Sequence, residues 1–313
     1  MPDITLPEND QPYVLYQASE TDNLSELDVE KVKALYKEHG AILFRGFEWD
    51  VPDFKDLTSK FCSHGAHNSS IGRDIVDREH IIQSVNLGNE AFPLHPEMSA
   101  QPWKPDVCWF ACQKPTISGG ETTICDGVEI IKALPNEMVE ELKSKKIKYV
   151  LPTEMDEIKY WLNTNNVTRE ALDNMPEDCP FEFFKMENAL YKSYVTDFFH
   201  ETMFQSKLAF GNFILFARYL NNRMNYPLYE DNSIIPEEIS AKIKEVSDPL
   251  TAPINWEKHD IIMIDNSRFL HGRNEVMPMD DRYILTYFGY LNFAELSPRD
   301  QKQRWRKPGF FRF

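Results

Sequence analysis

The feature that most constrains the fold is the spacing of the strand-like segments, which fall into two groups far apart in the chain. Residues 80–85, 106–113 and 122–125 read as short strands separated by turns. Residues 256–265 and 282–293 form the second group, one strongly apolar and the other rich in aromatics. Strands from both ends of a chain around a mixed middle are typical of one barrel or sandwich closed by distant segments. We therefore expect a mainly β core.

Helical segments surround these strands in the sequence. Apolar spacing predicts a helix over 24–40, ending at Gly40, and further helices over 51–65, 127–146 and 237–247. No internal repeat or low-complexity linker interrupts the chain. We expect one domain over residues 1–313, with helices packed outside the β core and a variable lid or insert at about 130–250.

Composition excludes several classes of function. The chain has 50 acidic and 34 basic residues, a formal charge of −16, which disfavours nucleic acid and anionic membranes as partners. Five cysteines without a CxxC pair indicate a reducing compartment. No apolar run approaches the roughly 18 residues of a membrane helix, and the N-terminus has no signal-like apolar region. We expect a cytoplasmic protein; its oligomeric state is left open.

The stretch "AFPLHPEMSA" places His95 and Glu97 on either side of Pro96. Residues two apart point to the same face of a strand, and proline, which lacks an amide proton, restricts this segment to a sheet edge or strand end. The pair could form a salt bridge, an acid–base pair or two ligands of one metal ion. A strand-end salt bridge is the commonest of these.

A further candidate ligand follows the apolar strand in "DIIMIDNSRFLHGR", where His271 comes shortly after an Asp-Asn turn. Two histidines and one carboxylate on a β scaffold form the facial triad of non-haem Fe(II) oxygenases, which leaves coordination positions open. Two other residues fit a dicarboxylate cosubstrate. Thr122 lies in the "SGGETT" turn, and Arg282 follows His271 by eleven residues. An arginine at the base of a pocket binds a carboxylate through two parallel hydrogen bonds, although a solvated strand-end arginine is the ordinary alternative.

These motifs resemble the TauD/TfdA family of Fe(II)- and 2-oxoglutarate-dependent dioxygenases. The likeness is densest over residues 41–47, 93–127 and 255–290, and it is thin between 130 and 250. The HxE spacing resembles the clavaminate-synthase-like branch, in which amino-acid oxygenases of natural-product pathways carry glutamate instead of aspartate. The resemblance implies a double-stranded β-helix, the jelly-roll core of cupin-like proteins.

The resemblance also implies a role for each motif residue. His95, Glu97 and His271 would bind Fe(II), and Thr122 and Arg282 would bind the far carboxylate of 2-oxoglutarate. With O2 as second cosubstrate, decarboxylation to succinate would be coupled to oxidation of an unactivated C–H bond by hydroxylation, desaturation or ring closure. The intact Glu97 argues against halogenation, because halogenating relatives replace this carboxylate.

The substrate is less constrained. We expect a small anionic, amino-acid-like molecule, free or carrier-tethered, in a biosynthetic pathway, with Arg73 and Arg273 as candidate substrate cations. Segments 159–168 and 191–204 would supply aromatic walls, while most of their aromatics are expected to belong to the core. The alternatives are a taurine-type, sulfonate or aryloxy-acid catabolic dioxygenase, a non-catalytic cupin-like binding protein, and a zinc or manganese isomerase or hydrolase. The last has no use for a dicarboxylate anchor. We expect His64, His67 and His259 not to bind metal.

Overall fold

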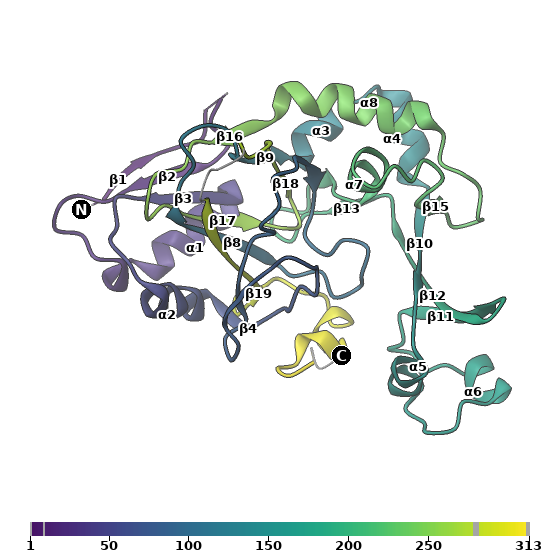
Figure 1. Cartoon of the computed structure of the whole chain (residues 1–313). Coiled ribbons are helices and arrows are strands. Elements are labelled where there is room, and N and C mark those ends of the chain that lie inside the picture. Colours follow the sequence, from purple (N-terminus) through teal and green to yellow (C-terminus); the bar gives the residue numbers. More distant parts are fainter. Residues whose placement is uncertain (1, 9, 278–281, 311–313) are drawn as a thin grey trace.

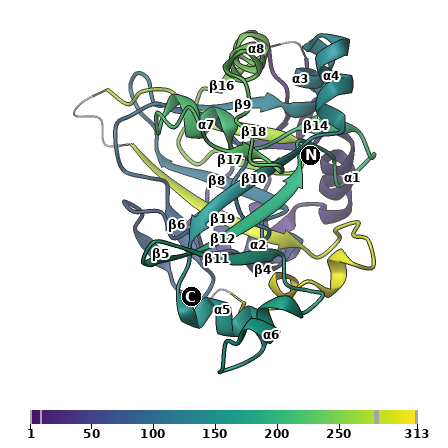
Figure 2. The same ribbon diagram turned by 90° about the vertical axis from the view of Figure 1, so that its right-hand side faces the viewer.

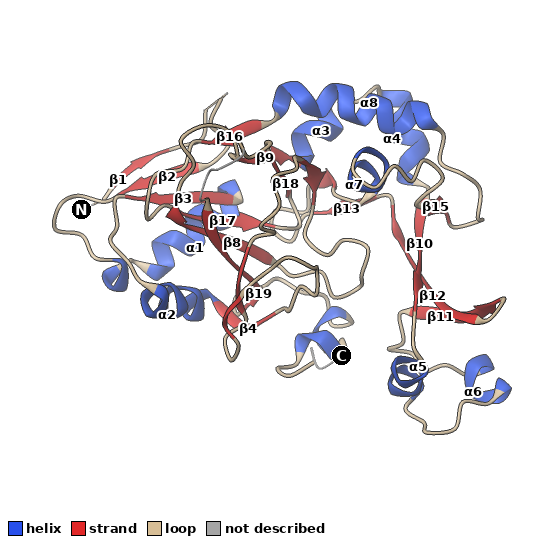
Figure 3. Ribbon diagram, in the orientation of Figure 1, coloured by secondary structure: helices blue, strands red, loops and turns tan. Residues whose placement is uncertain are grey.

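The computed structural model describes residues 2–8, 10–277 and 282–310. Its larger sheet is drawn in Figures 1 and 3 and consists of β1 (Asp3–Thr5), β2 (Val14–Gln17), β3 (Ala41–Arg45), β4 (Cys62–Gly65), β5 (Ile75–Asp77), β6 (Ile82–Ser84), β8 (Val107–Lys114), β17 (Ile261–Asp265) and β19 (Tyr283–Leu291). The strand order is β1-β2-β3-β17-β8-β19-β6-β5, with β4 also paired to β19. All pairs are antiparallel except β2 with β3.

The smaller sheet carries the segments that the sequence singled out. It consists of β7 (Phe92–His95), β9 (Thr122–Asp126), β16 (Ala252–Ile254) and β18 (Phe269–Arg273), in the antiparallel order β16-β9-β18-β7. β7 is an edge strand and ends directly before Pro96, as the missing amide proton predicts.

Alternation along the strands explains how the layers pack. In the larger sheet Ile42, Phe44 and Trp109 belong to a cluster with the helices α1 (Val29–His39) and α2 (Val51–Phe61). Their neighbours Leu43 and Phe110 point to the other face, where they join a cluster with residues of the smaller sheet. The helices therefore cover one face of the larger sheet and the smaller sheet covers the other. The predicted β core with surrounding helices is confirmed, as is its closure by distant strands.

Local signals set most helix ends, but several predicted helix bounds were wrong, and the helix expected from residue 24 begins at Val29. Asp28 caps the amide of Lys31 at the start of α1, and Gly40 ends it with a φ of 78°. The helix expected over 51–65 ends at Phe61, and the following residues form β4 because they pair with β19. Tertiary pairing overrides the helical pattern there.

The chain between the paired strands β9 and β16, residues 127–251, forms a separate layer that we call the insert (Figures 1 and 2). Its sheet has the order β11-β12-β10-β15 and β13 pairs with β14. These strands are β10 (Lys146–Pro152), β11 (Phe181–Met186), β12 (Ala189–Asp197), β13 (Phe199–Glu201), β14 (Leu208–Phe210) and β15 (Leu228–Tyr229).

The insert also holds six helices among the residues described: α3 (Gly127–Ala133), α4 (Asn136–Lys143), α5 (Met155–Leu162), α6 (Arg169–Asp173), α7 (Ile214–Tyr219) and α8 (Glu237–Ser247). The single helix expected over 127–146 is divided at Pro135, which cannot continue a helix. Short 3₁₀ turns lie at Leu24–Glu26, Asp248–Leu250, Asp300–Lys302 and Arg304–Arg306. In the ranges that the structure describes, no helix is long and apolar enough to span a membrane.

Candidate active site

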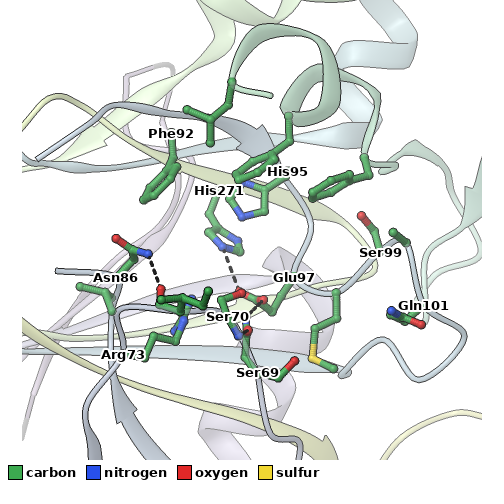
Figure 4. A pocket seen from close by; sticks show the side chains of 18 of the residues that line it. Ser69, Ser70, Arg73, Asn86, Phe92, His95, Glu97, Ser99, Gln101 and His271 are labelled. Carbon is green, nitrogen blue, oxygen red and sulfur yellow. Dashed lines mark hydrogen bonds and ion pairs between the residues drawn. The ribbon is translucent and has the colours of Figure 1, made fainter. Parts of the chain in front are cut away.

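A cavity of about 720 Å³ opens between the smaller sheet, the larger sheet, α7 and the insert (Figure 4). All seven site residues predicted from the sequence line it: His95, Glu97, His271, Thr122, Arg282, Arg73 and Arg273. Its size lies within the range of small-molecule sites and exceeds what 2-oxoglutarate alone requires. The cavity therefore has room for a second ligand.

His95, Glu97 and His271 converge on one point at the floor of this cavity (Figure 4). One potential ligand atom from each lies within 4.8 Å of the others. His95 ends β7 and is paired with His271 on the neighbouring strand β18, while Glu97 lies in the turn after β7. His271 Nε2 and Glu97 Oε2 are 3.6 Å apart. Pairing of β7 with β18 thus brings His271 next to His95 and Glu97, which are far from it in sequence.

The donor atoms fit a divalent metal ion. His95 Nδ1 lies 2.8 Å from the carbonyl of Pro93, which can only accept, so the proton is on Nδ1 and the lone pair of Nε2 is free. Burial and the nearby His271 lower the pKa of His95 to about 3, so the ring is neutral, as a ligand must be. His271 Nδ1 is buried without a hydrogen-bond partner among the described residues.

Glu97 is ionised and held from both sides. Burial alone raises the pKa of its carboxyl, but the hydrogen bond with His271 and the positive charge of Arg73 outweigh burial and lower the pKa to about 2. Asn68 Nδ2 donates to Glu97 Oε1 at 2.6 Å, which leaves Oε2 directed at His271. Asn266 fixes the backbone, accepting from the Glu97 amide at 2.8 Å and donating to its carbonyl at 3.1 Å.

Thr122 and Arg282 lie side by side at another part of the cavity. Arg282 Nη2 donates to Thr122 Oγ1 at 3.2 Å, and Trp256 Nε1 donates to the same oxygen at 3.1 Å. With two bonds accepted, the hydroxyl proton of Thr122 is available for a ligand oxygen. A side chain on Gly120, which has a φ of +67°, would meet the stem of Arg282 at 3.2 Å, so the glycine turn makes room for this arginine.

Arg282 has the environment of an anion site. Burial and the neighbouring Arg273 lower its pKa to about 10, and its buried Nε has no hydrogen-bond partner. In the part of the chain that the structure describes, no carboxylate forms an ion pair with it. A half-buried guanidinium with a buried, unpaired Nε beside a free hydroxyl proton suits the distal carboxylate of a bound dicarboxylate.

The two candidate substrate cations differ in how many of their donors are used. Arg73 Nη1 makes only two long bonds of 3.3 Å, to Ser84 and Thr286, and its Nε is buried without a partner. Arg273 donates to the carbonyls of Asn86 and Glu90 through all three nitrogens. Arg73 therefore has donors left for a ligand, whereas Arg273 fixes the loop before β7.

Several cavity residues were missed by the sequence reasoning. The aromatic walls include Phe92, Trp103, Phe213, Phe216 and Phe310, not the aromatics expected in segments 159–168 and 191–204. Most aromatics of those segments lie in the hydrophobic clusters. The i, i+3 spacing of Phe213, which precedes α7, and Phe216 within it was a detectable signal. Asn68 and Trp256 carry no local signal, because their roles depend on partners distant in sequence.

The histidines expected not to bind metal lie outside the triad. His259 Nδ1 lies 2.7 Å from Glu48, and the ring of His64 stacks on Tyr290. His67 lines the cavity but is not part of the candidate metal group found among the described residues.

Comparison with known proteins places this arrangement in a family. The family model described as "Taurine catabolism dioxygenase TauD, TfdA family" matches residues 10–287. The chain belongs to the TauD/TfdA family. Membership confirms the predicted enzyme class, a dioxygenase that uses Fe(II) and 2-oxoglutarate. The narrower HxE-branch assignment stays a prediction.

Solved structures share the TauD/TfdA fold at low sequence identity. PvcB from Pseudomonas aeruginosa is 16% identical, with 92% of this chain and 90% of that chain covered and a TM-score of 0.60. AAD-2, solved with Mn(II) and N-oxalylglycine, is 12% identical, with coverage of 95% and 100% and a TM-score of 0.59.

A putative taurine dioxygenase from Burkholderia xenovorans is 10% identical, with coverage of 95% and 92% and a TM-score of 0.60. At these identities the likeness concerns the fold alone. No curated protein is similar enough in sequence to match the chain.

Proposed function

We propose that this dioxygenase oxidises an unactivated C–H bond of an amino acid or amino-acid-derived small molecule in a biosynthetic pathway. The observation that carries the proposal is the division of one cavity into a His95–Glu97–His271 cluster, a Thr122–Arg282 anion site and a further arginine with free donors, Arg73. A hydrolase or isomerase would need only the first of these.

Each group has a separate task in this proposal. His95, Glu97 and His271 hold Fe(II), with Glu97 supplying Oε2 because Asn68 occupies Oε1. Thr122 and Arg282 bind the distal carboxylate of 2-oxoglutarate by hydrogen bonds from the hydroxyl and the guanidinium. Bound together, iron and 2-oxoglutarate would reduce O2, with one oxygen atom entering succinate as carbon dioxide is released and the other oxidising the substrate. The protein's own contribution is to orient the ligands and exclude water.

Arg73 supports an anionic substrate. Its guanidinium lies close enough to Glu97 for each charge to alter the other's pKa, and burial lowers the pKa of Arg73. A buried cation with free donors beside the iron ligands would attract an anionic group of the substrate despite the net charge of −16. Arg273 would contribute indirectly by fixing the loop at Asn86 and Glu90.

The test is a screen for substrate-stimulated succinate release from 2-oxoglutarate, with mass spectrometry of the oxidised product. Free amino acids, carrier-tethered amino acids, taurine and aryloxyacetates would be compared, with His271→Ala as the inactive control. Stimulation by an amino acid, and a product heavier by one oxygen or lighter by two hydrogens, would support the proposal. Stimulation by taurine or an aryloxyacetate alone would replace it with a catabolic function.

A further inference from the structure

A second polar group lines the same cavity within the insert. Glu157 on α5 and Lys192 on β12 form an ion pair between Oε1 and Nζ. Thr153 Oγ1 donates to the other carboxylate oxygen, Oε2, at 2.7 Å. The side chains are only 6% exposed for Lys192 and 16% for Glu157. Both residues nevertheless line the cavity rather than a closed core.

Aromatic rings surround this pair. Lys192 Nζ lies 4.7 Å from the ring centroid of Phe181 and 5.2 Å from that of Trp103. Trp103 ends a loop that starts at Glu97 and lines the cavity along most of its length. In Figure 4 the loop residue Gln101 lies on the opposite side of Glu97 from Arg73. The pair therefore lies against the loop that follows Glu97.

Stability does not explain an ion pair in this position. Removing two charges from water is unfavourable, and a buried pair is often no more stabilising than apolar residues of the same volume. Burial lowers the pKa of Lys192, and the hydrogen bond to Glu157 only partly offsets this effect. Both groups can also form further hydrogen bonds. The ammonium has three N–H donors and donates one hydrogen bond, to Glu157, and the carboxylate accepts two bonds at about four lone-pair positions.

We infer that Glu157 and Lys192 bind the dipolar head group of a free amino acid, its ammonium on Glu157 and its carboxylate on Lys192. The inference rests on the proposed function and specifies its substrate. Glu97 and Glu157 are the only carboxylates among the described residues that line the cavity, and Glu97 belongs to the metal cluster. The ammonium and carboxylate of an amino acid share one carbon, so they require an acceptor and a cation side by side.

Two consequences follow for the reaction. The head group would lie in the insert, so the carbon presented to His95, Glu97 and His271 would belong to the side chain of the amino acid. Attachment to a carrier through the carboxylate would remove the group that Lys192 binds. A free amino acid is therefore the substrate form that the pair accepts.

The experiment compares each stimulating amino acid with its N-acetyl and carboxamide derivatives, using succinate release by the Fe(II)-loaded enzyme. For the wild type, KM should be roughly tenfold or more higher for either derivative, because each loses one charge-assisted hydrogen bond. In Glu157→Gln the preference over the N-acetyl form should disappear, and in Lys192→Met the preference over the carboxamide. The KM for 2-oxoglutarate should not change in either variant.

Controls separate recognition from a structural role. Lys146→Met removes an exposed ion pair with Glu230 in the same insert sheet and should leave all preferences intact. If the pair is purely structural, replacing Glu157 or Lys192 would lower the unfolding temperature and change KM equally for the free amino acid and both derivatives. That result would overturn the inference. So would a wild-type enzyme that accepts the derivatives as well as the free amino acid. If no amino acid in any form stimulates succinate release, the proposed function itself fails.

Discussion

Replacing Arg282 with alanine tests the cosubstrate site most directly. Arg282 is half-buried beside Thr122, and within the described ranges it has no carboxylate partner. Its loss removes the donors that we assign to the distal carboxylate of 2-oxoglutarate. It leaves His95, Glu97 and His271 untouched, because the side-chain hydrogen bond of Arg282 goes to Thr122 and not to any of these three residues.

The magnitude follows from the kind of bond that is lost. Removing one partner of a buried, hydrogen-bonded charge pair costs about 2–5 kcal/mol. A loss of about 3 kcal/mol raises the dissociation constant of 2-oxoglutarate by a factor of roughly one hundred. The unliganded protein should not become less stable through loss of this charge, because Arg282 is desolvated and close to Arg273, and both effects lower its pKa.

The assay is calorimetric titration of 2-oxoglutarate into the Fe(II)-loaded protein without oxygen. Arg282→Ala should weaken binding about a hundredfold, and Thr122→Val should weaken it less. Arg282→Lys should fall between wild type and alanine, because lysine keeps the charge but not the planar fork. At the same 2-oxoglutarate concentration the wild type should gain more thermal stability than Arg282→Ala. An unchanged dissociation constant for Arg282→Ala would show that the dicarboxylate is bound elsewhere.

Four further outcomes are expected. His271→Ala should abolish 2-oxoglutarate decarboxylation, and normal turnover would refute the metal cluster. Arg73→Ala should raise the KM for substrate while the affinity for 2-oxoglutarate stays constant in titration. Asn68→Ala should weaken Co(II) or Fe(II) binding, measured by competition with a chelator, because Glu97 loses its 2.6 Å orienting bond. Burial lowers the pKa of His200 to about 3 from 6.5, so stability should fall by about 1.4 kcal/mol per unit as pH drops below 6.5. In denaturant unfolding at pH 7 and pH 5, the free energy of unfolding of His200→Gln should fall less between the two pH values than that of the wild type.

The two-residue spacing placed His95 and Glu97 on one face of a strand end, but on spacing alone a salt bridge was the commonest alternative. The metal cluster, Thr122 and Arg282 were predicted because their motifs together resemble those of the TauD/TfdA family. The β core could be predicted because its strands are short and apolar.

Other parts of the site depended on contacts that no local pattern encodes. Glu157 and Lys192 looked like ordinary surface charges, because their burial is created by Trp103 and Phe181. Asn68 orients Glu97 only after Gln83 on β6 has fixed its backbone, with Asn68 donating to Gln83 Oε1 at 3.2 Å. β4 reads as the end of α2 until β19 is present to pair with it.

The position of the insert has a consequence for how such enzymes could be re-engineered. Residues 127–251 leave the smaller sheet at the end of β9 and return to it at β16, where Ala252 pairs with Ile124. The two junctions are therefore neighbours, so the whole insert can be exchanged as one segment. The insert packs against an apolar surface of the smaller sheet formed by Leu94, Cys125 and Leu270. An insert taken from another enzyme would have to fit this surface. A chimera made at these junctions would keep the residues that we assign to iron and 2-oxoglutarate and should acquire the donor's substrate preference.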